Sequence, residues 1–446
     1  MSGTAIQEFA TTEEKAKAPW RFFLYSGLGI FAFFVPFPVG DTNTILLDHI
    51  VGWLKVGLGD AAKYVVWLII LAGAVVPFYT GTWRKSVARR VFAFLYIFAA
   101  IIATMLVFNF GPSVVFREEL GPFLMNKLVI PVGLLIPVGA PFLGLLVGFG
   151  LMEFIGVFVQ PIMRPLFKTP GRSAVDAVAS FVGSYSLGLL VTDRVYKAGG
   201  YTSKEAAIIA AGFSTASATF MVVIAKALGL MSVWGLYFGA TLIVTFIVTA
   251  IMVRVPPISS IPDEYYPGVT PTPEEAISGD RMKLAWLEAK HVLKNVPSLM
   301  RVLWENFRDG MLMTMQVLPG ILSIGFLGLV LAYYTPIFEW IGYIFYPLLW
   351  VLQIPDTQLA SEALAIGLSE LFLPATIVAD SPHDVTRILI AIVSVSQIFF
   401  FSSMVPSILA TEIPLKIKDI LAVWFIRVVL SVVVAAPFAY LIAMAL

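Results

Sequence analysis

Long apolar segments dominate the chain, and short polar or charged stretches separate them. A helix needs ~20 apolar residues to cross a bilayer. Segments near that length lie at about 20–38, 64–80, 90–110, 129–163, 174–192, 205–228 and 231–253, and then at about 312–353, 358–378, 386–410 and 419–445. Several of them are interrupted by clusters of Gly, Pro or Ser. The pattern predicts an all-α, polytopic membrane protein in which some helices are broken.

Composition supports lipid as the solvent for much of the surface. Hydrophobic residues make up 59% of the chain and charged residues 13%, with a mean hydropathy of +0.91. A soluble domain carries about twice that charged fraction. The net charge of +1 gives no basic stripe, so we expect no nucleic-acid partner.

Several kinds of chemistry lack the residues that they need. The chain has no cysteine, which excludes disulfides, thiol catalysis and thiolate metal sites. His49, His291 and His383 are too scattered for metal-ligand spacing. HExxH, GxSxG and phosphate-binding loop motifs are absent, which argues against an enzyme or an ATP-driven pump. We expect no cofactor, with Na⁺ a candidate only as a coupling ion.

Basic residues indicate the orientation. Arg84, Lys85, Arg89 and Arg90 lie in the loop after the second apolar segment. By the positive-inside rule this loop is cytoplasmic, and if residues 20–38 form the first span, the N-terminus is cytoplasmic too.

An internal repeat follows the first three segments. EFIGVFVQP (Glu153–Pro161) matches EWIGYIFYP (Glu339–Pro347), and FSTASATF (Phe213–Phe220) lies opposite VSVSQIFF (Val393–Phe400). Each half contains a Glu-bearing helix, a broken apolar segment, a polar turn, a Ser-rich helix and a final spanning helix. Chance similarity between apolar helices is the alternative.

Charge indicates that the two halves have opposite orientations. Residues 164–204 contain six basic residues, whereas the matching stretch 356–387 contains one basic and five acidic residues. The positive-inside rule then places the first stretch in the cytoplasm and the second outside. Inverted repeats with interrupted helices are typical of secondary transporters.

These observations divide the chain into five parts. The parts are a cytoplasmic tail (1–19), an N-terminal scaffold of about three helices (20–128), a first repeat (129–254), a cytoplasmic connector (255–311) and a second repeat (312–446). The connector is Pro-rich and then has apolar residues at 3–4 spacing among Lys and Arg. This spacing predicts an amphipathic helix on the membrane surface, bent at Pro297.

Each repeat contains a sequence typical of a re-entrant hairpin. Phe181–Gly188 has two glycines and three polar side chains at membrane depth, and Gly367–Pro374 places Glu370 at the second turn. Hairpin turns of this kind expose backbone N–H groups and small hydroxyls to a cavity. A hydroxyl-rich helix follows each hairpin. The candidate solute-binding residues are Ser184, Ser186, Ser214, Thr215, Ser217, Ser369, Glu370, Ser394 and Gln397. Helix–helix packing is the alternative role for each hydroxyl.

Glu153 and Glu339 lie in otherwise apolar helices, and Glu370 lies at a hairpin turn. An acidic residue within the membrane is expensive, at roughly 2.5–3.5 kcal/mol for a charge at a helix centre. One interpretation is that they bind the solute, a coupling cation or a proton. The other is that each carboxylate caps a helix or fixes a hairpin through backbone hydrogen bonds.

The segment Pro165–Phe220, which begins PLFKTPGRSAVDAVASFVGSYS, resembles the YjiH family of bacterial inner-membrane proteins. That family carries the Gate, or nucleoside-recognition, domain also found in concentrative nucleoside transporters. SVSQIFFFSSMVPSILATEIPL (Ser394–Leu415) resembles its second copy. The resemblance implies a multi-pass protein of the bacterial inner membrane. It also implies a transport domain of two hairpins and two broken helices that moves against a scaffold, as in elevator transporters.

The resemblance also assigns places to candidate residues. Ser184 and Ser186 would lie at the first hairpin tip, Ser369 and Glu370 at the second, and Ser394 and Gln397 on the broken helix. Nucleoside transporters carry a Gln and a Glu at the first tip, where this chain has GSYS. Nucleosides, amino acids and small peptides therefore all stay open as solutes.

The leading hypothesis is a secondary active, elevator-type transporter of a small polar or zwitterionic solute, coupled to Na⁺ or H⁺. Its partners would be the lipid bilayer, the solute and, through the N-terminal helices, further copies of the chain. The alternative is a membrane-embedded scaffold or recognition protein without turnover. The two hypotheses differ in whether both hairpins line one water-filled cavity. A channel fits closed hairpins less well than alternating access does.

Overall fold

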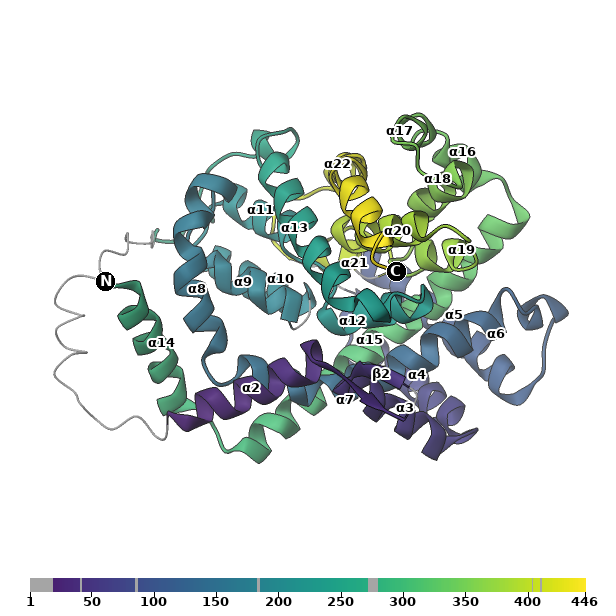
Figure 1. The fold of residues 1–446 in the computed structure, drawn as a ribbon, viewed down its shortest axis with the longest axis horizontal. Coiled ribbons are helices and arrows are strands. Elements are labelled where there is room, and N and C mark those ends of the chain that lie inside the picture. The colour runs from purple at the N-terminus through teal and green to yellow at the C-terminus, as the bar shows by residue number, and fades with distance from the viewer. Residues whose placement is uncertain are drawn as a thin grey trace.

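The computed structural model describes residues 19–40, 42–84, 87–182, 185–271, 280–402, 404–409 and 411–446. Its regular structure is almost entirely helical (Figure 1). Helices satisfy their backbone hydrogen bonds internally, which lipid demands of an apolar chain. The all-α fold class is confirmed.

The N-terminal part is more broken than the sequence predicted. It consists of α2 (Trp20–Phe34), β1 (Pro36–Val39), β2 (Thr42–Ile45), α3 (Leu46–Leu58), α4 (Ala61–Tyr79) and α5 (Val87–Phe108). The prediction of a first spanning helix over 20–38 was wrong. Helix α2 has 15 residues, and the chain then turns back in an antiparallel pair of strands that begins with Pro36 opposite Ile45. Of the predicted cytoplasmic tail, residues 1–18 lie outside the described residues.

Short helices connect this part to the first half of the repeat. They are η2 (Ser113–Phe116), α6 (Gly121–Phe123) and the π-helical η3 (Leu124–Val129), while η1 (Thr82–Arg84) lies between α4 and α5. The first half then contains α7 (Ile130–Val147), α8 (Leu151–Ile162), η4 (Met163–Phe167), α9 (Ser173–Val182), α10 (Tyr185–Lys197), α11 (Ser203–Gly212), α12 (Ala218–Ala227), η5 (Met231–Val233) and α13 (Trp234–Met252).

The second half follows the same order of elements as the first. Between the two halves, the connector contains η6 (Ile258–Ser260) and α14 (Arg281–Asn295). The second half contains α15 (Leu299–Tyr334), α16 (Ile337–Gly342), α17 (Tyr346–Val351), α18 (Thr357–Ile366), α19 (Leu373–Val378), α20 (Asp384–Ser396), α21 (Met404–Leu409) and α22 (Ile417–Ala443). The chain is broken at Pro297, where a bend within one helix was predicted: α14 ends at Asn295 and α15 begins at Leu299. The boundary proposed between residues 311 and 312 falls inside α15.

Within the described residues, six helices are long and apolar enough to cross a membrane. They are 61–79, 89–108, 121–145, 231–252, 299–334 and 417–443. The chain is therefore a multi-pass membrane protein.

Helices α9 and α10 form the first predicted hairpin. At about 1.5 Å per residue, the ten residues of α9 span only ~15 Å, half the thickness of the hydrocarbon core. The arms run antiparallel, because Asp176 lies opposite Thr192 and Ser180 lies against Gly188. Helices α18 and α19 form the second hairpin, with Glu370 at its turn, as predicted.

Both predicted broken helices are present. Helix α11 ends at Gly212 and α12 begins at Ala218, while α20 ends at Ser396 and α21 begins at Met404. The two breaks thus align Phe213 with Gln397. This alignment is one helical turn further along than the sequence match, which paired Phe213 with Val393.

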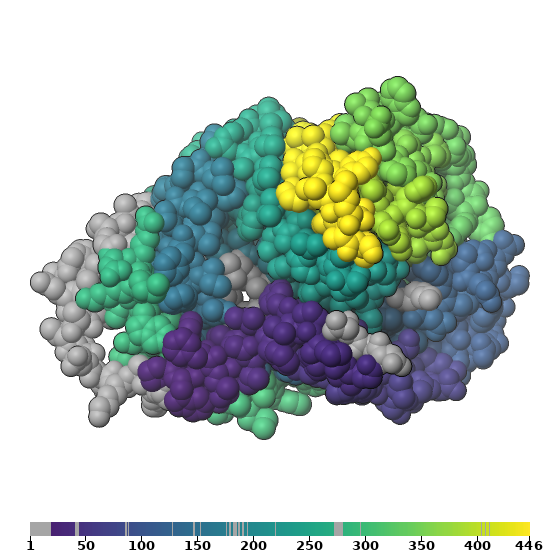
Figure 2. Space-filling view, viewed as in Figure 1, coloured from purple at the N-terminus to yellow at the C-terminus, as the bar shows by residue number. Residues whose placement is uncertain are grey.

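The long helix α15 packs along α7, α5 and α4 and forms the base on which the hairpins lie (Figure 1). Small residues allow these helices to approach closely: a Cβ added at Gly73 of α4 would lie 1.9 Å from the Met315 carbonyl oxygen of α15. Helix α22 packs against α13 and α20, and in the space-filling view it lies between the first-half and second-half helices (Figure 2).

The predicted inversion can be tested by cysteine labelling, since the natural chain has no cysteine. Ala198 and Asp380 are exposed and lie at the outer ends of the first and second hairpins. Because positive charge surrounds only the first, we expect a membrane-impermeant maleimide to label Asp380→Cys in intact cells and Ala198→Cys only after permeabilisation. Labelling of both variants from the same side would contradict the inversion.

Candidate functional site

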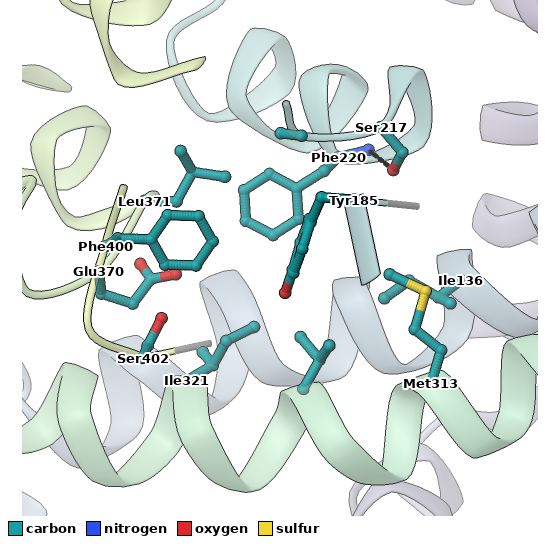
Figure 3. A pocket seen from close by; sticks show the side chains of 12 residues that line it. Ile136, Tyr185, Ser217, Phe220, Met313, Ile321, Glu370, Leu371, Phe400 and Ser402 are labelled. Carbon is teal, nitrogen blue, oxygen red and sulfur yellow. Dashed lines mark hydrogen bonds between the residues drawn. The ribbon is translucent and has the colours of Figure 1, made fainter. Parts of the chain in front are cut away.

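The two hairpins and the two helix breaks meet at one cavity over α7 and α15 (Figure 3). Its volume of about 20 Å³ leaves room for about one water molecule. The lining residues are Ile136, Tyr185, Ala216, Ser217, Phe220, Met313, Val317, Ile321, Glu370, Leu371, Phe400 and Ser402. Figure 3 shows Glu370, Leu371, Phe400 and Ser402 on one side, with Tyr185 and Ser217 facing them.

The first break presents three of the candidate hydroxyls. Ser217 lines the cavity and caps α12, because its Oγ accepts a hydrogen bond from the Phe220 N–H at 3.3 Å. Ser214 and Thr215 are buried, and their hydroxyl oxygens have no hydrogen-bond partner in the part of the chain that the structure describes. Buried hydroxyls are normally paired, so these two are available to a water or a ligand.

Glu370 lies at the tip of the second hairpin and is 1% exposed. Its Oε2 accepts hydrogen bonds from the N–H groups of Phe372 (2.6 Å) and Leu373 (3.1 Å), at the start of α19. The carboxylate therefore has the capping role considered from the sequence. It also lines the cavity, so capping and solute or proton binding are compatible.

The second hairpin is joined to the second break through the backbone. The Phe401 N–H donates to the Leu368 carbonyl at 2.8 Å, and the Ser402 N–H donates to the Ser369 carbonyl at 3.0 Å. The Ser369 backbone therefore holds this tip in place, and its side chain is half-buried. The tip and the break form one continuous wall of the cavity.

Two further candidates are buried behind this wall and contact other protein groups. The Gln397 Nε2 donates to the Gly367 carbonyl at 3.0 Å, and its Oε1 accepts from the Trp424 indole at 3.1 Å. The Ser394 hydroxyl donates to the Ile390 carbonyl one turn back at 2.7 Å. Both side chains have the bonds expected of packing and positioning residues.

Four other predicted residues lie elsewhere. Ser184 lies outside the described residues, and Ser186 is in α10, next to the cavity-lining Tyr185. Glu153 is in the first turn of α8, which packs against α14, and its Oε2 is buried without a hydrogen-bond partner among the described residues. Glu339 is in α16 and accepts a hydrogen bond from the Tyr343 hydroxyl at 3.1 Å. Neither carboxylate lines the cavity.

The sequence prediction missed the aromatic part of the site. Tyr185 and Phe400 make an edge-to-face contact, with ring centroids 5.8 Å apart, between the first hairpin and the second break. Phe220 and Phe372 make a similar contact at 6.5 Å between α12 and the second hairpin. Their positions in the sequence could have identified them, because each aromatic residue lies within or directly beside a polar segment predicted to form a hairpin or a break.

Comparison with known proteins now places the chain in a family. It is 32% identical over 453 residues to an uncharacterized protein of Alkalihalophilus pseudofirmus, a match that covers 95% of this chain and 94% of the relative. The Gate family, described as nucleoside recognition, matches residues 129–231. The chain belongs to the family of the Alkalihalophilus protein and carries a Gate domain.

The Gate match begins next to α7 and ends at η5, so it contains the whole first hairpin and first break. The resemblance to Gate-domain proteins is thereby confirmed, while the narrower YjiH assignment stays a prediction. Among solved structures, a doubly substituted CNTnw in an outward-facing state is similar over 98% of this chain and 96% of its own, with a TM-score of 0.44 and 14% sequence identity.

The buried contacts of Gln397 make its role testable. We expect Gln397→Leu to lower the apparent melting temperature, because the Gly367 carbonyl and the Trp424 indole would each lose a partner, at about 1–3 kcal/mol for each buried group. Trp424→Phe removes one of these bonds and should have the smaller effect. A Gln397→Leu protein with the same melting temperature as the wild type would contradict the positioning role of Gln397.

Proposed function

We propose that the protein is a secondary active transporter that carries a small polar or zwitterionic organic solute, coupled to Na⁺ or H⁺. The observation that carries the proposal is the single cavity lined by both hairpins and both helix breaks. A hydrophobic bilayer tolerates interrupted backbone only where it is buried in protein or lines a water-filled cavity. Four interruptions around one cavity favour a solute site at membrane depth.

Glu370 gives this site its chemistry. Its carboxylate lines the cavity, and its hydrogen bonds within the described residues come from backbone N–H groups. A buried intramembrane carboxylate without a basic partner is costly, which favours a role in binding a proton, a cation or an ammonium group of the solute. The Ser402 side chain, on the same side of the cavity, and the Ser217 side chain, on the opposite side, can accept and donate hydrogen bonds to a solute.

The small cavity supports movement as part of the mechanism. About 20 Å³ holds a water molecule and not a nucleoside or an amino acid. Solute binding therefore requires the hairpins to separate from the breaks or from α7 and α15. We propose an elevator motion, in which α9–α12 and α18–α21 move as a unit against α4, α5, α7 and α15.

The alternative, a recognition protein without turnover, keeps the same cavity but needs no movement. Both hairpins line the same cavity, which favours transport, because a static recognition site needs only one hairpin. The Gate match agrees with either, since its description names recognition.

A thermal-shift screen against nucleosides, amino acids and dipeptides, with and without Na⁺, tests the site. A ligand raises the melting temperature by mass action, by the equivalent of about 2.7 kcal/mol at 100 times its Kd. We expect the shift to disappear in Glu370→Gln, whose amide oxygen can still accept the Phe372 and Leu373 bonds. Glu362→Gln, in the same hairpin but away from the cavity, should keep it. A ligand that raises the melting temperature of Glu370→Gln as much as that of the wild type would show that Glu370 does not bind it.

Cross-linking tests the elevator motion. The Lys226 ammonium of α12 forms an ion pair with the Asp48 carboxylate of α3, which packs on α7. Because this pair joins a moving helix to the scaffold, we expect a bifunctional methanethiosulfonate, which forms a disulfide with each cysteine of Asp48→Cys/Lys226→Cys, to stop uptake until a reductant cleaves those disulfides. The control is Lys197→Cys/Glu412→Cys: Lys197 lies at the end of α10, and Glu412 lies in the segment after α21 and is bonded through its N–H to Asp193 of α10, so this pair should move together. Full uptake by the cross-linked Asp48–Lys226 protein would exclude movement at this contact.

A further inference from the structure

Arg427 of α22 is fully buried at the level of both helix breaks. Its Nε donates to the Ser396 carbonyl at 2.9 Å, and its Nη1 donates to the Thr249 hydroxyl of α13 at 3.1 Å. The Thr249 hydroxyl lies within hydrogen-bond distance of two carbonyl oxygens, Gly212 at 2.8 Å and Thr245 one turn back at 2.7 Å, and its single proton is shared between them. One guanidinium thus connects the ends of two helices from opposite halves of the chain.

Gly212 and Ser396 are the last residues of α11 and α20. The final carbonyls of a helix have no partner within the helix, and the helix dipole adds about half a negative charge there. Two such ends together offer roughly one negative charge to a group between them. No carboxylate among the described residues is bonded to Arg427, and its Nη2 has no hydrogen-bond partner there. Its counter-charge therefore comes from the Ser396 end, which it contacts directly, and from the Gly212 end, which it reaches through Thr249.

Helix ends of this kind are where transporters with interrupted helices coordinate mobile cations. We propose that the Arg427 guanidinium is a built-in cation, which occupies the place between the two breaks that a mobile cation would otherwise take. The consequence for coupling, which rests on the proposed function, is that Na⁺ is not required.

The fixed charge is connected to the cavity wall. Trp424, one turn before Arg427 on α22, holds Gln397, and Gln397 holds the Gly367 carbonyl at the root of the second hairpin tip. The same face of α22 therefore positions the second break and the tip that carries Glu370. Arg427 is a positioning residue, because it lies behind this wall and does not line the cavity.

The test measures apparent melting temperatures of the purified full-length protein in choline chloride, in NaCl and with millimolar methylguanidinium. We expect the wild type to melt at the same temperature in NaCl and choline chloride. Arg427→Ala should melt several degrees lower and recover at least half of the loss with methylguanidinium, which fits the vacated space. Arg427→Met should melt lower without recovery, because its side chain fills that space without a charge. Ser431→Ala, one turn further along α22, controls for a buried polar deletion away from the breaks.

A wild type that Na⁺ stabilises relative to choline would overturn the proposal, and this comparison needs no variant. Equal responses of Arg427→Ala and Arg427→Met to methylguanidinium would overturn it too. Where Arg427→Ala does not fold, Arg427→Lys replaces it and should keep most of the wild-type melting temperature by keeping the charge. Since none of these readings depends on uptake, failure to find a transported solute would count against the proposed function alone.

Discussion

The structure depends on how it satisfies the backbone groups that two interrupted helices release inside the membrane. Each interruption leaves carbonyls without helical partners, and lipid offers none. Side chains of α13 and α22 supply hydrogen-bond donors for these carbonyls. The Thr249 hydroxyl lies within hydrogen-bond distance of the Gly212 carbonyl, and the Arg427 guanidinium donates to the Ser396 carbonyl. Without these donors the breaks would leave buried carbonyls unpaired, at a cost of about 1–3 kcal/mol for each group.

Contacts between the two halves give the cavity its shape. The first hairpin contacts the second break through Tyr185 and Phe400, and the second hairpin contacts α12 through Phe372 and Phe220. Each half therefore completes the site of the other. The physical requirement is the same at both places, because a hairpin arm of 6–13 residues cannot span the bilayer and must pack its tip against another interrupted element.

The sequence predicted the hairpins and breaks from Gly, Ser and Pro clusters inside apolar segments, although such a cluster does not always interrupt a helix: α7 runs unbroken through Pro137 and Pro141. It placed Glu370 at a turn and Ser217 at a break, and both line the cavity. It could not distinguish the cavity-lining role of Ser217 from the positioning role of Gln397, because both are polar residues near a break. Only the tertiary contacts show that Gln397 faces Trp424. Arg427 was overlooked for a similar reason: a single arginine in an apolar helix gives no indication of its partners. The first span was overestimated because α2 ends just before Pro36 and Pro38, within a run that stays apolar beyond the end of the helix.

The strengths of the contacts around the cavity differ, and this difference favours one way of opening it. The second tip is joined to the second break by two backbone hydrogen bonds, and Gln397 and Trp424 hold the same region from behind. The contact between Phe220 of α12 and Phe372 of the second hairpin joins two apolar rings and contributes about 0.5–1.5 kcal/mol beyond its buried area. The weaker boundary therefore runs between α12 and the second hairpin. An opening along that boundary would enlarge the cavity while leaving Glu370, its backbone cap and the second break together as one rigid wall.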